Sequence, residues 1–224
     1  MHRTAPMRRG VLLDIDGTLI DSNDAHARAW VDALAETGRS VELERVRALV
    51  GQGGDKMVAE LAHVARDSRE GEALSARRKE LFLSRYCPTL RALPGARALL
   101  ARIHAAGMVT VAATSAEEDE LEAILAQGRI GDLIDVRATS SDADRSKPDP
   151  DIIDAALKRA HLAAGEAALV GDTPWDVEAA RRAHVPIVAL RCGGWNDAAL
   201  ANAAAIYDDP ADLVAHFAES PLAR

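Results

Sequence analysis

The feature that most constrains the fold is the alternation of short apolar runs with amphipathic segments along most of the 224-residue chain. The runs GVLLDID, GMVTVAATS, DLIDVRATSSD, EAALVGD and VPIVAL have the length and apolar character of buried strands. Between them lie segments with apolar residues at helical spacing, such as PDPDIIDAALKRAHL, and several of these end at glycine. Alternating strands and helices predict an α/β fold, a Rossmann-like doubly wound parallel sheet covered on both faces.

One region interrupts this alternation. From Asp21 to about Pro88, helical patterns follow one another without a convincing strand. We therefore expect an α-helical domain of residues 21–88, inserted into a core domain formed by residues 1–20 and 89–224. The segment CPTLRALPGA, with Pro88, Pro94 and Gly95, suits a hinge back into the core.

Composition narrows the function classes. Hydrophobic residues make up 48% of the chain but aromatic residues only 3%, so the core is expected to consist of Ala, Leu, Val and Ile. The net charge of −8 argues against a nucleic-acid partner, which would favour a basic face. An acidic protein that handles an anionic substrate usually holds a cation at its site, often a metal ion.

The remaining bulk features favour a cytoplasmic protein. Cys87 and Cys192 lack the C-x-x-C spacing of a zinc site, so two free thiols in a reducing compartment are expected. No apolar run approaches the length of a membrane span. The apolar run after the basic N-terminus is broken at Asp14, which is too early for a signal peptide.

Polar side chains gather where the predicted strands end. Residues two apart in a strand face the same side, so the two carboxylates of VLLDIDGTLIDS would crowd each other without a cation or proton between them. The turn signal GT that follows allows the second acid to bend away. Simple helix capping is the alternative, but other strand ends and one loop repeat the pattern. The residues are Asp14, Asp16, Thr114, Ser115, Lys147, Asp172 and Asp176.

This set of side chains suits phosphoryl transfer. That reaction needs a nucleophile, a divalent cation, donors to the phosphoryl oxygens and an acid for the leaving group. An aspartate can be the nucleophile and pass through an aspartyl-phosphate, while a lysine supplies positive charge in the transition state. Because hard oxygen ligands suit Mg²⁺, we expect a Mg²⁺ site at the carboxyl ends of the parallel strands.

The motifs resemble those of the haloacid dehalogenase-like hydrolase superfamily, subfamily I, and within it the phosphoglycolate phosphatases and beta-phosphoglucomutases. The match runs from Val11 to about Phe217, and DIDGT together with GDTPWD is highly specific. The resemblance implies a phosphatase whose helical insertion is a cap over the site. It implies that Asp14 is the nucleophile and Asp16 the general acid/base, whose backbone carbonyl also binds Mg²⁺.

The same resemblance assigns the other strand-end residues. Thr114 would donate to the phosphoryl group with Ser115 beside it, and Lys147 would hold the phosphate and steady the nucleophile. Asp172 would bind Mg²⁺ and Asp176 would support the metal site. Dehalogenases of the superfamily lack an acid at the position of Asp16, because displacement on carbon needs no leaving-group proton, so this residue favours phosphate chemistry.

Two features of the insertion bear on the substrate. His26 and Trp30 share a helix face, and similar residues occur in the beta-phosphoglucomutase group; a structural histidine beside a packing tryptophan is the equal alternative. The loop GQGGDK, with Gly54 and Lys56, is expected to bring backbone amides and an ammonium group to the substrate, unless it is a simple turn. The mutase group carries an arginine for a distal phosphate where this chain has Gly54, which favours a phosphatase.

The leading hypothesis is thus a Mg²⁺-dependent phosphatase of small phosphorylated metabolites, with neither nucleic acid nor membrane as partner, acting as a monomer or homodimer. A sugar-phosphate mutase is the alternative within the family. A phospho-accepting signalling module is the alternative from another class, although such modules are much shorter and have no helical insertion. His63, His104, His161 and His184 are expected to be surface or helix-end residues, and Trp175 is expected to pack beside the site.

Overall fold

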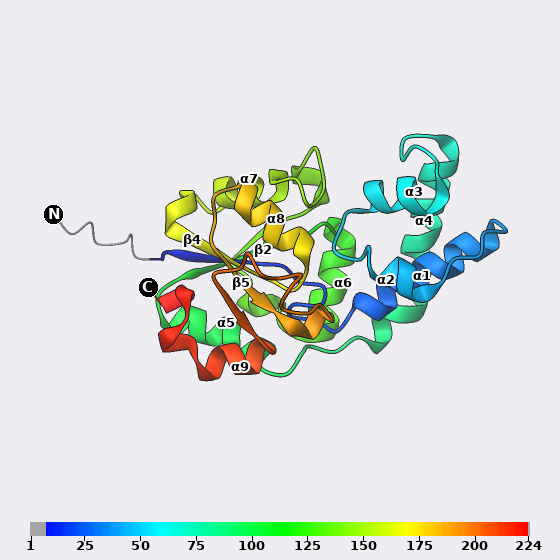
Figure 1. Ribbon diagram of the computed structural model, residues 1–224. Helices are drawn as coiled ribbons and strands as arrows, with labels where there is room; N and C mark the ends of the chain where they lie inside the picture. The colour runs from blue at the N-terminus through cyan, green and yellow to red at the C-terminus, as the bar shows by residue number, and fades with distance from the viewer. Residues whose placement is uncertain (1–7, 224) are drawn as a thin grey trace.

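A six-stranded parallel sheet forms the centre of the molecule in the computed structural model, which describes residues 8–223 (Figure 1). The strands are β1 (Gly10–Leu13), β2 (Val109–Ala113), β3 (Val136–Ala138), β4 (Ala167–Gly171), β5 (Ile187–Leu190) and β6 (Ala205–Tyr207). The helices are α1 (Asn23–Glu36), α2 (Leu43–Arg47), α3 (Gly54–Ala62), α4 (Arg69–Leu81), α5 (Ala96–Ala105), α6 (Glu118–Gly128), α7 (Asp151–Arg159), α8 (Pro174–Arg182) and α9 (Pro210–Ala215).

The order of the strands places β1 at the point where the chain changes direction across the sheet. The order is β3-β2-β1-β4-β5-β6. From β1 the chain builds outward through β2 and β3, then returns to add β4, β5 and β6 on the other side. Ligands of open α/β sheets bind at such a switch point, beyond the carboxyl ends of the strands. The predicted doubly wound parallel sheet is confirmed.

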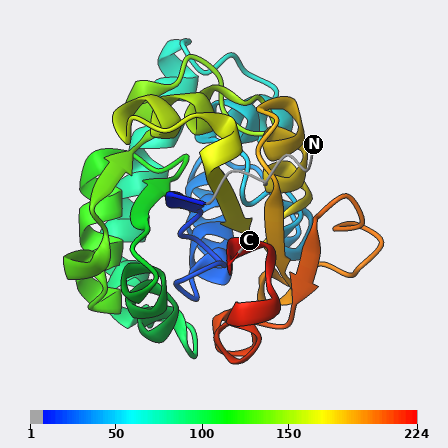
Figure 2. The same ribbon diagram turned by 90° about the vertical axis from the view of Figure 1, so that its left-hand side faces the viewer.

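Helices cover both faces of the sheet, as Figures 1 and 2 show. Side chains alternate across a strand, so Val11 and Leu13 pack against α5, α6 and α9 while Leu12 packs against α7 and α8. All three side chains are fully buried. A strand buried on both faces must be apolar throughout, which explains the unbroken run VLL ahead of the first acid.

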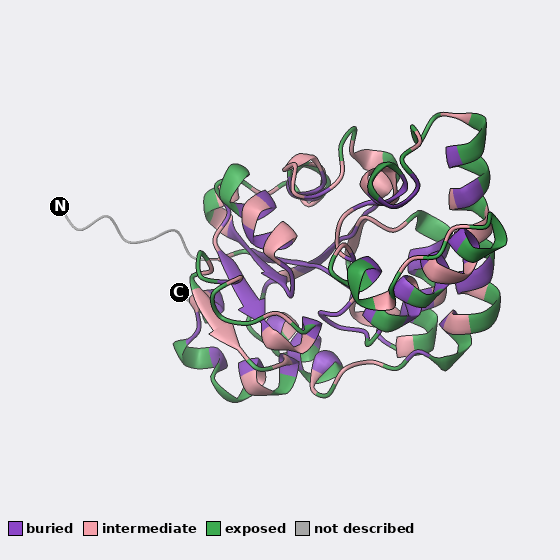
Figure 3. Ribbon diagram, turned by 45° about the vertical axis from the view of Figure 1, so that its right-hand side comes forward, coloured by how far each residue is buried: buried purple, intermediate pink, exposed green. Residues whose placement is uncertain are grey.

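The helices α1–α4, called the inserted helices below, lie beyond the carboxyl ends of the strands (Figures 1 and 3). They have a hydrophobic cluster of their own, in which Trp30, Leu34, Val58 and Leu74 are buried. A π-helical segment, Phe82–Tyr86, and a short 3-10 turn, Cys87–Thr89, lead back toward the sheet. No strand lies between residues 21 and 88, and the division into two domains at these residues stays a prediction.

The C-terminal pair β6 and α9 has no counterpart among the elements expected from the sequence. The strand β6 has only three residues, lies at the sheet edge and is half-buried throughout, so it lacks the long apolar run that marks a central strand. Among the described residues no helix has the length and apolar character needed to cross a membrane. Both cysteines are free.

Candidate active site

Three polar residues of the site lie at the carboxyl ends of three neighbouring strands. Asp14 follows β1, Thr114 follows β2 and Asp172 follows β4. Leu13 pairs with Ala112 on one side and Val170 on the other, so the carboxyl ends of these strands are level. Residues 58 to 158 positions apart in the chain therefore meet because parallel pairing places the ends of the three strands side by side.

Gly17 turns the chain back directly after Asp16. Its φ is +77°, a left-handed conformation that favours glycine. A Cβ at this position would lie 2.1 Å from Asn23 Nδ2 and 2.3 Å from Asp172 Oδ2, so a larger residue would collide with the site. Asp16 accepts hydrogen bonds from Ser22 Oγ at 2.5 Å and lies 2.9 Å from His26 Nε2. The turn therefore separates the second acid from the first, as the motif predicts.

Lys147 lies between two carboxylates. Its Nζ is 2.5 Å from Asp14 Oδ1 and 2.7 Å from Asp176 Oδ1, and its side chain is 1% exposed. It comes from the loop ahead of α7, whereas Asp176 stands in the first turn of α8. A lysine this deeply buried needs such partners to keep its charge.

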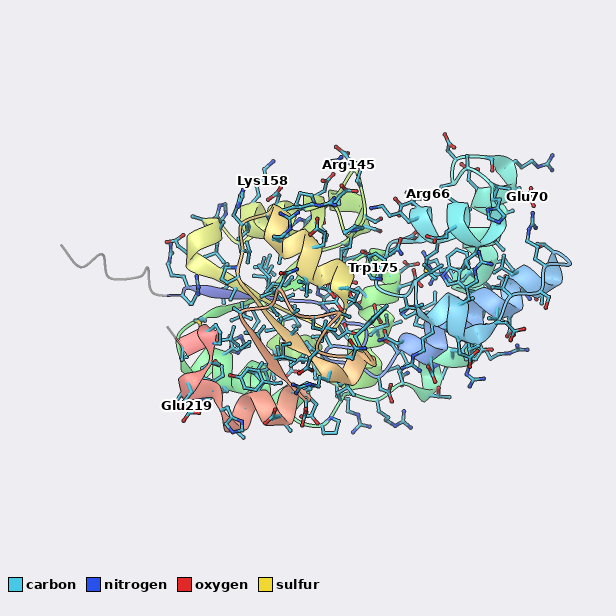
Figure 4. All side chains as sticks on the ribbon, viewed as in Figure 1. Arg66, Glu70, Arg145, Lys158, Trp175 and Glu219 are labelled. Carbon is cyan, nitrogen blue, oxygen red and sulfur yellow. The ribbon has the colours of Figure 1, made fainter. Side chains whose placement is uncertain are left out.

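The N-terminus of α8 fixes Asp176. Its Oδ2 accepts from the backbone N–H and the hydroxyl of Thr173, and its own N–H donates to that hydroxyl, which makes a capping box. One carboxylate oxygen thus caps the helix and leaves Oδ1 for Lys147. Trp175, one residue earlier, lies at the junction between the sheet core and the inserted helices (Figure 4), where it is close to Gly51.

Asp172 is held by two residues that the sequence analysis did not assign to the site. Thr18 Oγ1 lies 2.8 Å from Asp172 Oδ1 and 3.2 Å from Asp14 Oδ2, so this hydroxyl links the two acids. Asn23 donates to Asp172 Oδ2 at 3.0 Å. Thr18 directly follows the DIDG stretch, and this proximity is the signal that could have identified it.

Burial and repulsion set the charge states of the acids. Burial, with the nearby Asp176 and Asp16, raises the pKa of Asp14 to about 7 despite the contact with Lys147. Burial also raises the pKa of Asp172 well above its usual range, with Asp14 and Asp176 adding to the effect. For Asp16 the effect of burial is outweighed by His26 and Ser22, which lower its pKa. Contact with Asp14 and Asp176 raises the pKa of Lys147, although burial alone would lower it.

These groups form a site that a divalent cation fits. Carboxylate oxygens of Asp14, Asp172 and Asp176 lie within 4.8 Å of one another, and all three residues are buried. Three carboxylates with one ammonium group carry two net negative charges when ionised. A doubly charged, hard cation that prefers oxygen ligands complements this set, and it would favour the ionised forms that burial opposes.

The acids open into a cavity of about 60 Å³ between the strand ends and the inserted helices. Of the residues expected at the site, Asp14, Asp16, His26, Gly54, Thr114 and Ser115 line it, together with Trp30. Thr114 Oγ1 accepts a hydrogen bond from the N–H of Ala116, so its own hydrogen can point to a ligand. His26 stacks on Phe82, with ring centroids 4.0 Å apart.

Lys56 has a different environment from the other expected residues. Its Nζ donates to the carbonyl of Ser146 at 2.6 Å, to the carbonyl of Lys147 at 3.2 Å and to Asp149 Oδ2 at 2.8 Å. These contacts use all three N–H groups of the ammonium. Lys56 is not among the residues that line the cavity; it joins the inserted helices to the loop that carries Lys147.

Two further charged residues line the cavity, and neither was among the residues assigned to the site from the sequence. Arg78 on α4 pairs with Glu120 on α6, with Nη1 2.5 Å from Oε1, and the two side chains are 14% and 2% exposed. The guanidinium also lies over the ring of Trp30, 5.4 Å from its centroid. The partners are 42 positions apart and belong to different layers, so local pattern gives no reason to join them.

Comparison with known proteins agrees with this geometry. A family model described as haloacid dehalogenase-like hydrolase matches residues 11–190. The chain belongs to this hydrolase family. The match covers the strand ends that carry Asp14, Thr114 and Asp172 and confirms the resemblance drawn from the motifs.

Curated relatives of this hydrolase include two bacterial proteins named phosphoglycolate phosphatase. The protein from Rhodospirillum rubrum is 32% identical over 217 residues, covering 92% of this chain and 90% of the relative. The protein from Pseudomonas syringae pv. tomato is 32% identical over 211 residues, covering 91% and 78%.

Solved structures show the same fold. A hydrolase from Pseudomonas syringae matches with a TM-score of 0.86 at 30% identity, covering 95% of this chain and 99% of that one. The protein CbbY from Rhodobacter sphaeroides, solved in complex with phosphate, matches with a TM-score of 0.80 at 22% identity, covering 92% and 96%. The second likeness concerns the fold alone.

Proposed function

We propose that this hydrolase is a Mg²⁺-dependent phosphatase of small phosphorylated metabolites that works through an aspartyl-phosphate on Asp14. The observation that carries the proposal is the buried cluster of Asp14, Asp172 and Asp176 around Lys147, open to a cavity lined by Thr114. The family and the names of the relatives support phosphate ester hydrolysis.

Asp14, Asp172 and Asp176, together with the backbone carbonyl of Asp16, would hold Mg²⁺. When bound, the ion supplies positive charge to the phosphoryl oxygens and neutralises the acids around it. Lys147 supplies a second positive charge at Asp14. Mg²⁺ would also account for how an acidic chain accepts an anionic substrate.

In the first step a carboxylate oxygen of Asp14 attacks phosphorus, and the bond from phosphorus to the leaving oxygen breaks. The leaving oxygen takes a proton from Asp16. In the second step water attacks phosphorus, the bond to Asp14 breaks, and Asp16 receives a proton from the water. Lys147 and the hydroxyl of Thr114, with Ser115 beside it, bind the phosphoryl oxygens in both steps.

His26 is the group that can supply the proton of the first step. Asp16 needs a proton to act as an acid, yet His26 and Ser22 lower its pKa. The Nε2 of His26 lies 2.9 Å from Asp16 Oδ1, and the ring is 12% exposed. We therefore assign one proton to the Asp16–His26 pair, shared between the two groups and passed through Asp16 to the leaving oxygen.

The mutase alternative has less support from the cavity. A bisphosphate needs a cation for its distal phosphate, but the expected position is Gly54. Arg78 is the lone Arg or Lys among the described residues that line this cavity, and Glu120 already pairs with it. The hydrolase family and the inserted helices also argue against a non-catalytic signalling module. Cytoplasmic location and a monomeric or homodimeric state stay predictions.

Phosphate release from p-nitrophenyl phosphate tests the proposal. The purified chain with Mg²⁺ should release phosphate, and Asp14→Asn should reduce turnover to background because the amide is not a nucleophile. Asp132→Asn is the matched control, since Asp132 is an exposed acid paired with Arg97 on the core surface. Equal turnover by wild type and Asp14→Asn would contradict a mechanism in which Asp14 is the nucleophile.

A further inference from the structure

A second cavity, of about 310 Å³, adjoins the active-site cavity of about 60 Å³. Gly54, Arg78, Ser115 and Glu120 line both cavities. The first cavity is lined by Asp14 and Thr114, the residues proposed to contact the phosphoryl group, whereas the second is lined by neither. The leaving group of a substrate therefore lies where the two cavities meet, against Arg78, Ser115 and Glu120.

The charge of Arg78 is already matched at this junction. Its guanidinium lies against the buried carboxylate of Glu120 and over the ring of Trp30. Taking a buried partner away from its ion pair is strongly unfavourable, because the remaining charge stays out of water and unpaired. A substrate anion near Arg78 would therefore meet a guanidinium whose charge Glu120 already balances, with the carboxylate of Glu120 close by.

The other charges around the junction are mainly negative. Of the charged residues that line the second cavity, five are acidic and three are basic. Lys79 pairs with Glu117 and Asp119, and Arg66 is exposed in the turn between α3 and α4 (Figure 4). The described lining thus offers a carboxylate no buried, uncommitted cation. The acidic residues that line the second cavity are Asp55, Glu72, Glu117, Glu120 and Asp144, and the basic residues are Arg66, Arg78 and Lys79.

Three buried polar atoms around the same junction have no hydrogen-bond partner among the described residues. They are Arg78 Nε, Ser115 Oγ and Ser75 Oγ, and each residue lines at least one of the two cavities. Buried polar atoms are normally paired with protein, water or ligand. The Nε group donates, while each hydroxyl can both donate and accept, which is the pattern that an alcohol hydroxyl satisfies.

We propose that the leaving group is a small uncharged alcohol with at least one further hydroxyl, a fragment of a polyol or sugar, and that the Arg78–Glu120 pair sets this preference against carboxylates. This inference rests on the proposed phosphatase function and narrows its substrate class. Phosphoglycolate, which appears in the names of the relatives, carries a carboxylate. The chain's preference therefore differs from the substrate in those names.

A pair of matched substrates tests the inference. 2-Hydroxyethyl phosphate and 2-phosphoglycolate differ in their leaving groups by a hydroxymethyl group in place of a carboxylate. With Mg²⁺, wild-type protein should show a kcat/KM at least about tenfold higher for 2-hydroxyethyl phosphate, a difference of about 1.4 kcal/mol in transition-state free energy. Glu120→Gln frees the charge of Arg78 and should lower this preference at least about tenfold.

Glu118→Gln is the matched control, because Glu118 stands two positions away, pairs with Arg137 and lines neither cavity. It should keep the wild-type preference. A folded Glu120→Gln protein that keeps that preference would overturn the role of the pair. Should Glu120→Gln not fold, Ser115→Ala replaces it, and this change should lower kcat/KM more for 2-hydroxyethyl phosphate than for 2-phosphoglycolate.

The outcomes separate this inference from the function on which it rests. Equal rates on both substrates, faster turnover of 2-phosphoglycolate, or turnover of p-nitrophenyl phosphate alone would overturn the inference and leave the phosphatase intact. No release of phosphate from any of the three compounds would instead reject the phosphatase function itself.

Discussion

The ammonium group of Lys147 lies 2.5 Å from Asp14 Oδ1, and both side chains are almost fully removed from solvent. Lys147 also forms an ion pair with Asp176, so one ammonium group balances the charge of two buried carboxylates. This contact joins the loop before α7 to the end of β1 and fixes the attacking group that we propose. The stability of the fold and the chemistry of the site therefore depend on the same lysine.

Replacing Lys147 by methionine should destabilise the protein as well as inactivate it. The change leaves Asp14 and Asp176 buried without their counter-charge, and breaking a buried pair in this way costs about 3–5 kcal/mol. Urea denaturation of the metal-free protein measures the loss. Lys158→Met is the control, because Lys158 is exposed on α7 (Figure 4). A free energy of unfolding equal to that of wild type would show that the contact carries no stability.

The Asp16–His26 pair predicts an effect that depends on the leaving group. Asp16→Asn should lower kcat about 10²-fold or more on an alkyl phosphate, whose leaving oxygen needs a proton. In the first step, measured as the single-turnover rate of release of the leaving group, the loss should be much smaller on p-nitrophenyl phosphate, whose leaving group is stable as an anion. His26→Gln should show the same contrast to a lesser degree. Parallel losses in this single-turnover rate on both substrates would argue against proton delivery by this pair.

Mg²⁺ should stabilise the protein more at pH 8 than at pH 5. Burial raises the pKa of Asp14 from 3.8 to about 7 and also raises that of Asp172. Between pH 4 and 7 the folded metal-free chain therefore binds more protons at these groups than the unfolded chain, and their contribution to stability falls as pH rises.

At pH 5 protons compete with the metal for these carboxylates, whereas at pH 8 the carboxylates are free to bind it. Thermal melts with Mg²⁺ and with a chelator measure the shift at each pH. We expect the shift at pH 8 to exceed that at pH 5 by at least about 2 °C, which corresponds to roughly 1 kcal/mol for a chain of this size. Identical shifts would mean that these acids do not bind the ion.

Replacing Lys56 should change kcat rather than KM. Because its contacts go to Ser146, to the carbonyl of Lys147 and to Asp149, Lys56→Met should move the loop of Lys147 and lower kcat at least about tenfold. Lys79→Met is the control, since Lys79 also joins the inserted helices to the core but through exposed acids. A raised KM with unchanged kcat would instead support the substrate contact expected from the sequence.

Much of the fold and of the site could be predicted because parallel strands place their ends together. Asp14, Thr114 and Asp172 each directly follow an apolar run. Once these runs are predicted to be parallel strands of one sheet, the three residues are expected at the same edge of that sheet. The turn at Gly17 was likewise visible, because a glycine after two acids marks a change of direction. Asp176 could be placed because it lies only four positions after Asp172, in the first turn of the helix that follows.

The rest depended on packing between distant segments. Nothing near Arg78 or Glu120 in the sequence joins them, and their meeting follows from how α4 docks on α6. The local pattern likewise gave no reason to direct Lys56 to the carbonyls of Ser146 and Lys147 rather than to a ligand. The strand β6 was missed because three half-buried residues at a sheet edge produce too little apolar signal.

The most direct test of the account is to identify the residue that carries the phosphoryl group during turnover. Wild-type protein with Mg²⁺ and substrate is quenched in acid within one turnover. Tritiated borohydride then reduces the acyl phosphate to an alcohol with release of phosphate, and the tritium-labelled peptide is mapped. We expect the label on Asp14 and none in Asp14→Asn. A label on another residue, or steady turnover with no labelled protein at any quench time, would contradict the account.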